Sequence, residues 1–157
     1  MTTIHSVTVD EIDIGQKASY SKTCSWDDIQ LFAKVSGDVN PVHLDEDYAS
    51  TTIFGRRVAH GMYTGSLVSA ALATVFPGPG TIYLGQEIKL RAPVFIDDTI
   101  TVELEVDSVR KEKSIVSMLF TCQNQHGDTV ASGNLTVMAP REKVSLEAPE
   151  LPKITLG

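Results

Sequence analysis

The sequence predicts an α+β fold in which one buried helix is enclosed by a mostly antiparallel sheet. An apolar stretch runs from Met62 to Phe76, and the hydrophobic period changes to two after the turn at residues 77–80. The connections between the later strands are too short for crossover helices, which favours antiparallel pairing. With 157 residues, 42% of them hydrophobic, the chain is expected to form one domain.

The helix from Met62 to Phe76 carries small residues at every fourth position, Gly65, Ser69 and Ala73. Its other faces are apolar, so the helix requires enclosure by other elements. It falls short of the roughly 20 apolar residues that span a membrane, and no membrane association is expected.

Four segments alternate between apolar and polar residues, as half-buried strands do: 82–91, 100–107, 114–122 and 129–138. In the first strand, Ile82, Leu84, Ile88 and Leu90 are expected to share the buried face. A turn-rich segment at residues 123–128 joins the last two strands.

A further helix is predicted from Ser25, which caps it, to near Gly37. Its residues Ile29, Phe32 and Ala33 share the inward face. The acidic run 45–47 is expected to be a solvated face or the start of another helix.

Residues 1–139 are expected to form the domain, and residues 140–157 a C-terminal tail. Prolines at positions 140, 149 and 152 interrupt this tail, and its contact with the domain is expected through Leu151, Ile154 and Leu156.

The formal charge of −7 and the pI of about 5.0 argue against partners such as nucleic acid or an anionic membrane. Cys24 and Cys122 are expected to be free thiols in a reducing compartment. Residues 1–7 lack the basic start and apolar run of a signal peptide, so a cytoplasmic location is expected.

Asp38 and His43 flank Pro41, which forces Asn40 out of helical geometry and makes residues 38–45 a constrained turn. In such a turn both side chains can face one target. The alternative is that Asp38 only forms the turn and His43 is a structural polar residue. An EF-hand does not fit, because His43 stands where that loop requires glycine. Zinc does not fit either, since the four histidines are scattered along the sequence.

Gly61 stands at the entry to the buried helix, where free backbone N–H groups can hold an anion or a polarised carbonyl oxygen. The alternative is that Gly61 merely relieves crowding between helix and sheet. His60 is expected to be structural.

Two runs together, Ser36 to Asp45 and Ala59 to Met62, resemble the MaoC-type hydratases, especially the short (R)-specific enoyl-CoA hydratases. The resemblance covers residues 12–139 and implies a hot-dog fold, a long central helix wrapped by a curved antiparallel sheet. It also implies catalytic roles for Asp38 and His43, thioester binding by Gly61, orientation of the aspartate by Ser66, and a substrate contact from Asn40.

The implied reaction is syn addition of water to a trans-2-enoyl-CoA, giving (R)-3-hydroxyacyl-CoA, with polyhydroxyalkanoate synthesis as the suggested consumer. This chemistry requires a base, an acid and a donor to the thioester oxygen. It needs no metal or redox cofactor, because coenzyme A enters with the acyl-CoA substrate. The resemblance also implies a homodimer.

Three alternatives compete with this assignment. An acyl-CoA thioesterase usually carries a carboxylate on the central helix, and residues 62–76 contain neither Asp nor Glu. A non-catalytic acyl-binding module is expected to lack Asp38 or His43. A 3-hydroxyacyl-[acyl-carrier-protein] dehydratase uses the same chemistry, although a net charge of −7 suits an acidic carrier poorly.

Overall fold

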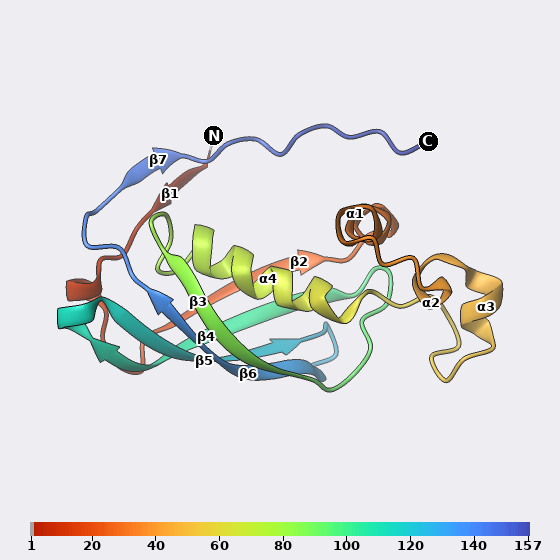
Figure 1. Ribbon diagram of the computed structural model, residues 1–157, viewed down its shortest axis with the longest axis horizontal. Helices are drawn as coiled ribbons and strands as arrows, with labels where there is room; N and C mark the ends of the chain where they lie inside the picture. The colour runs from red at the N-terminus through yellow and green to blue at the C-terminus, as the bar shows by residue number, and fades with distance from the viewer. Residues whose placement is uncertain (1) are drawn as a thin grey trace.

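The α+β prediction is confirmed by the computed structural model, which describes residues 2–157. The helix α4 (Gly61–Thr74) lies across one face of a five-stranded sheet (Figure 1). The strands of this sheet are β2 (Lys17–Thr23), β3 (Ile82–Leu90), β4 (Thr99–Arg110), β5 (Ile115–Gln123) and β6 (Thr129–Met138). Their order is β2-β4-β5-β6-β3, and every neighbouring pair is antiparallel.

Three shorter helices gather near the N-terminal end of α4 (Figure 1). They are α1 (Trp26–Ser36), α2 (Pro41–Leu44) and α3 (Glu46–Ser50). A separate two-stranded sheet joins β1 (Thr3–His5) to β7 (Ser145–Glu147), and single 3-10 turns lie at Val9–Glu11 and Lys111–Lys113.

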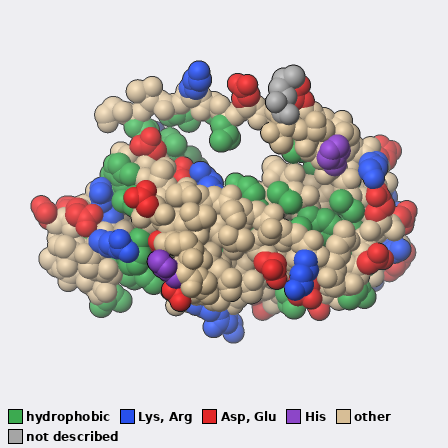
Figure 2. All heavy atoms as spheres, turned by 180° about the vertical axis from the view of Figure 1, so that it is seen from behind, with side chains coloured by type: hydrophobic (Ala, Val, Ile, Leu, Met, Phe, Trp, Pro, Cys, Tyr) green, Lys and Arg blue, Asp and Glu red, His purple; other side chains and the backbone are tan. Residues whose placement is uncertain are grey.

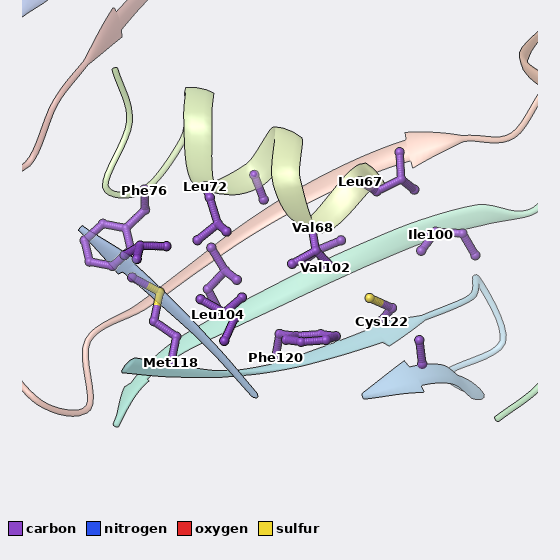
Figure 3. Close-up of a cluster of buried hydrophobic side chains, with 14 of the residues drawn as sticks. Leu67, Val68, Leu72, Phe76, Ile100, Val102, Leu104, Met118, Phe120 and Cys122 are labelled. Atoms are coloured by element: carbon purple, nitrogen blue, oxygen red, sulfur yellow. The ribbon is translucent and has the colours of Figure 1, made fainter. Parts of the chain in front are cut away.

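The core lies between α4 and the sheet. Val68 and Leu72 point from α4 toward the side chains of β4 and β5 (Figure 3). The predicted alternation of buried and exposed side chains along β4 is confirmed, because Ile100, Val102 and Leu104 are fully buried. Removal of this apolar surface from water is the main stabilisation of the fold.

The predicted ends of α1 are confirmed. The Ser25 hydroxyl accepts a hydrogen bond from the Asp28 N–H, and the Asp28 carboxylate accepts one from the Ser25 N–H, each at 3.0 Å. Gly37 ends the helix in the left-handed conformation, with φ of 78°, which glycine adopts without strain. The acidic run also begins a helix, since Asp45 caps α3.

Two strand expectations need correction. In β3, Ile82, Leu84 and Leu90 are each about half exposed, whereas Ile88 is partly buried as expected. A register shift between Tyr83 and Gly85 and the position of β3 at the sheet edge account for this. Strand β2 was not predicted, because its apolar positions are limited to Ala18 and Tyr20.

The C-terminal segment also differs from expectation. Its β7 pairs with β1, and of the three residues expected to dock, Leu151 and Ile154 are exposed whereas Leu156 is partly buried. Pro149 and Pro152 cannot donate hydrogen bonds to a strand ladder, so pairing stops after β7. The rest of the segment stands off the molecule with a gap beneath it (Figure 2).

Helix α4 is enclosed on most of its surface, but one stripe remains exposed: Met62, Ser66, Ser69 and Ala73. Both cysteines are free, as predicted, and both are buried. Within residues 2–157, no helix has the length and apolar character needed to cross a membrane.

Candidate active site

The loop after α1 is shaped by short side chains that bind nearby backbone. One carboxylate oxygen of Asp38, Oδ1, accepts the Asn40 N–H at 3.1 Å, and the Asn40 side-chain oxygen accepts the Val42 N–H at 3.2 Å. Asn40 thus caps α2, and Pro41 occupies its first turn. The predicted constrained turn therefore contains one turn of helix, which begins only after Asp38.

This loop brings Asp38 and His43 together, as the sequence predicted. His43 Nε2 lies 3.8 Å from the second carboxylate oxygen of Asp38, Oδ2. The other ring nitrogen, Nδ1, lies 2.8 Å from the Val58 carbonyl. Because a carbonyl oxygen only accepts, Nδ1 carries the proton in this bond and Nε2 is the nitrogen that faces Asp38.

The surroundings of His43 favour its neutral form. Burial lowers the pKa of His43, and the neighbouring His60 ring lowers it further. The hydrogen bond to Val58 and the charge of Asp38 act in the opposite direction without reversing the shift. A neutral His43 presents a lone pair on Nε2 beside the Asp38 carboxylate.

His60 is part of this site, although the sequence analysis treated the histidines as scattered. Its ring stacks on His43, with centroids 3.8 Å apart and planes 27° apart. Asp38, His43 and His60 each place a potential ligand atom within 4.8 Å of the others. The stacked rings direct their in-plane lone pairs side by side, however, instead of toward one point. This geometry does not favour a shared metal ion.

Gly61 is the first residue of α4, so its N–H has no partner within the helix. A Cβ at this position would clash with the Leu90 side chain. Leu90 is about half exposed and its side-chain end can move, so crowding alone does not require glycine here, and a binding role for the N–H is compatible with the structure.

A cavity of about 400 Å³ opens against these groups, lined by Asn40, His43, His60 and Gly61. Apolar side chains make up much of its remaining wall: Val42, Phe54, Val58, Leu90, Val94 and Val130. Thr64, which the sequence analysis missed, also lines it and is buried. Thr64 lies three residues after Gly61 and therefore on the same face of the helix. This spacing could have identified Thr64 from the sequence.

Ser66 does not join this cluster. Its hydroxyl donates to the Tyr63 carbonyl at 2.6 Å, and it lines a separate groove with Phe32, Met62 and Tyr83. Five residues along a helix correspond to a rotation of about 140° from Gly61, which turns Ser66 toward a different side. Within residues 2–157, the expected contact between Ser66 and Asp38 is therefore not formed.

The fold and the site together define a class of protein: a single buried helix on a curved antiparallel sheet, with an Asp–His pair beside the helix N-terminus. The family model for the MaoC like domain matches residues 7–133. The chain belongs to this MaoC-like family, and its hot-dog fold is confirmed.

The chain is also similar to individual proteins. It is 47% identical to the (R)-specific enoyl-CoA hydratase of Rhodospirillum rubrum, over 83% of this chain and 90% of that protein. The unliganded R-hydratase PhaJ1 from Pseudomonas aeruginosa superimposes with a TM-score of 0.94, at 49% identity over 99% of this chain and 100% of that one. The (R)-hydratase of Aeromonas caviae involved in PHA biosynthesis gives a TM-score of 0.79, at 40% identity over 82% and 98% of the two chains.

Proposed function

We propose that this protein is an (R)-specific enoyl-CoA hydratase. The observation that carries the proposal is that His43 and Gly61 line one largely apolar cavity, with the Asp38 carboxylate 3.8 Å from His43 Nε2. The similarity to proteins named (R)-specific enoyl-CoA hydratase supports the same reaction and substrate class.

In the proposed mechanism, Asp38 and His43 hold the reacting water. The 3.8 Å separation of Oδ2 and Nε2 leaves room for a water oxygen about 2.8 Å from both atoms. One member of the pair accepts a proton from the water as the water oxygen attacks C3, and the pair then delivers that proton to C2 on the same face. The Gly61 N–H stabilises the charge that develops on the thioester oxygen.

The walls of the cavity suit an acyl-CoA. Its apolar residues can surround the acyl chain, and Arg91 contributes a positive charge that suits the phosphates of coenzyme A. Asn40 shapes the loop that carries the pair and lies at the cavity wall, consistent with a substrate contact.

The proposal includes a homodimer. The edge strand β3 leaves Leu84 about half exposed, and Leu84 borders the groove next to the open stripe of α4. An exposed sheet edge beside an apolar groove favours pairing with a second copy. The stand-off segment after β7, with Leu151 and Ile154 exposed, offers further apolar surface.

Light scattering tests this assembly. We expect twice the chain mass for the wild type and a shift toward monomer for Leu84→Glu. Val35→Glu is the matched control, because Val35 is also exposed but lies outside the groove. A wild-type mass near 17.0 kDa with full activity would contradict the dimer.

A substrate panel tests the reaction. Short, medium and long trans-2-enoyl thioesters of coenzyme A and of acyl carrier protein are compared by loss of the conjugated absorbance, with a thiol reagent present. We expect the coenzyme A series to lose absorbance without thiol release. Thiol release at the same rate would indicate a thioesterase, and faster turnover of the carrier series would indicate a dehydratase of carrier-bound substrates.

The proposal places the enzyme in the cytoplasm, and the two free cysteines are consistent with a reducing compartment. Supply of (R)-3-hydroxyacyl-CoA to polyhydroxyalkanoate synthesis is part of the proposal. It is supported by the similarity to the A. caviae hydratase involved in PHA biosynthesis.

A further inference from the structure

His60 makes one hydrogen bond that links two parts of the site. Its Nε2 lies 3.1 Å from the backbone carbonyl of Asp38. Because that carbonyl only accepts, Nε2 donates and carries the ring proton. His60 also immediately precedes Gly61 at the start of α4. The bond therefore connects the loop of the carboxylate to the helix end that carries the thioester donor.

The two ends of the site loop are held differently. The His43 end is fixed by two bonds, from the Val58 N–H to the Val42 carbonyl at 3.2 Å and from His43 Nδ1 to the Val58 carbonyl. At the Asp38 end, the local bonds to Ser36 and Asn40 shape the loop but do not attach it to α4. Among the described residues, the His60 bond is the hydrogen bond that joins the Asp38 backbone to the N-terminal end of α4.

The second ring nitrogen of His60 argues that the bond matters. His60 is 3% exposed, and its Nδ1 is buried without a hydrogen-bond partner among the described residues. The ring packs against Phe32 and His43, with centroids 5.0 Å and 3.8 Å away. A phenylalanine ring would fill this space without leaving a buried nitrogen unpaired. Packing alone therefore does not account for a histidine here.

We propose that His60 is a positioning residue that fixes Asp38 relative to His43 and the Gly61 N–H. The inference rests on the proposed hydratase function for its effect on catalysis, while the hydrogen bond itself can be tested without substrate. The reacting water must meet the acid–base pair and the thioester donor at one fixed spacing, and a displacement of about 1 Å can cost about 10²-fold in rate.

Two substitutions separate the hydrogen bond from the packing. His60→Phe keeps a ring between Phe32 and His43 but removes the donor, whereas His60→Gln keeps an N–H donor at a similar reach but removes the ring. We expect His60→Phe to lower kcat about 10²-fold with little change in KM, and His60→Gln to stay within about tenfold of wild type. His126→Phe, in an exposed turn, is the control and should match the wild type.

Long-range ¹H–¹⁵N NMR of the imidazole nitrogens provides a test that does not depend on activity. In the wild type we expect the proton of His60 on Nε2 and that of His43 on Nδ1. In His60→Phe the backbone signals of Asp38 should shift more than in His60→Gln. If the protein gave these NMR results but had no hydratase activity, the hydrogen bond between His60 and Asp38 would be supported and the proposed function would be rejected.

Three results would overturn the inference. The first is a His60 proton on Nδ1 with Nε2 bare, which rules out the bond to Asp38 even if a variant fails to fold. The second is a folded His60→Phe with kcat within about threefold of wild type, well below the expected loss. The third is equal impairment of both variants, which would assign the role of His60 to its ring.

Discussion

The sheet with α4 and the site segment at residues 37–60 are stabilised in different ways. In the first region, apolar side chains such as Val68, Leu72 and Phe120 are almost fully buried. In the second, short helices and turns depend on individual polar side chains, and Asp38 itself is 49% exposed. The difference implies that core substitutions change the free energy of unfolding, whereas substitutions in the site segment change the geometry of the active groups.

The largest effect is expected from the proposed catalytic pair, Asp38 and His43. Asp38→Asn and His43→Gln should each lower kcat about 10² to 10⁴-fold, because each removes one of the two groups proposed to hold the water. Asparagine keeps an oxygen for the Asn40 N–H, so the loop should persist. Steady-state kinetics and thermal unfolding, measured on the same samples, check this.

Asp45→Asn is the matched control, since Asp45 lies in the same segment and asparagine can also cap α3. The double variant Asp38→Asn/His43→Gln should lose far less than the product of the single losses, because both residues act on one water. Near-normal turnover of either single variant would remove that residue from the mechanism.

A core substitution should show the opposite pattern. Leu72→Ala should lower the free energy of unfolding by about 3 kcal/mol, because it leaves a cavity under α4. The folded enzyme should keep a kcat close to wild type. Denaturant titration is the measurement, and Leu119→Ala, at a position that is 47% exposed on β5, should cost much less. If both substitutions lowered the free energy of unfolding by similar amounts, burial would not explain the cost of the Leu72 substitution.

The cap of α1 should give a smaller, pH-dependent effect. Burial raises the pKa of Asp28, but the hydrogen bonds from Ser25 and the pairing with Lys22 lower it overall. The stabilisation is therefore complete above the ordinary carboxyl pKa and is lost as the pH falls through the lowered value.

At neutral pH, Asp28→Asn should cost about 1 kcal/mol of the free energy of unfolding. The difference in the free energy of unfolding between variant and wild type should disappear in acid, because the wild-type carboxylate is protonated there. Unfolding curves at several pH values check this, and a gap that widens on acidification would contradict the assigned sign.

Ser66→Ala should have the smallest effect. The hydroxyl binds the Tyr63 carbonyl of its own helix and faces the separate groove. We therefore expect kcat to stay within about twofold of wild type, as for loss of a partly exposed local hydrogen bond. A fall in kcat of tenfold or more in a folded, dimeric variant would show that Ser66 does orient Asp38. In that case Ser66 of one copy would act on Asp38 of the other.

The sequence was most informative where structure follows local rules. Periodicity predicted α4 and four strands of the main sheet, and capping residues predicted both ends of α1. The turn around Pro41 indicated that Asp38 and His43 can face one target. These features depend on residues within a few positions of one another.

The features that sequence analysis missed depend on distant contacts. His43 and His60 stack across 17 positions that no periodicity relates. The exposure of Leu84 follows from a register shift at a sheet edge, and β1 pairs with β7 through only three residues of each strand. Ser66 was assigned by motif alone, and the rotation of the helix turns it away from the cavity.

The central claim is that Asp38, His43 and the Gly61 N–H present one face of the substrate to water. The most direct test is the stereochemistry of hydration of crotonyl-CoA by the wild-type protein. The product should be oxidised by an (R)-specific 3-hydroxyacyl-CoA dehydrogenase and left untouched by an (S)-specific one, because the fixed geometry exposes one face of C3. A product that is mainly (S), or a mixture of both, would contradict the assignment of these three groups.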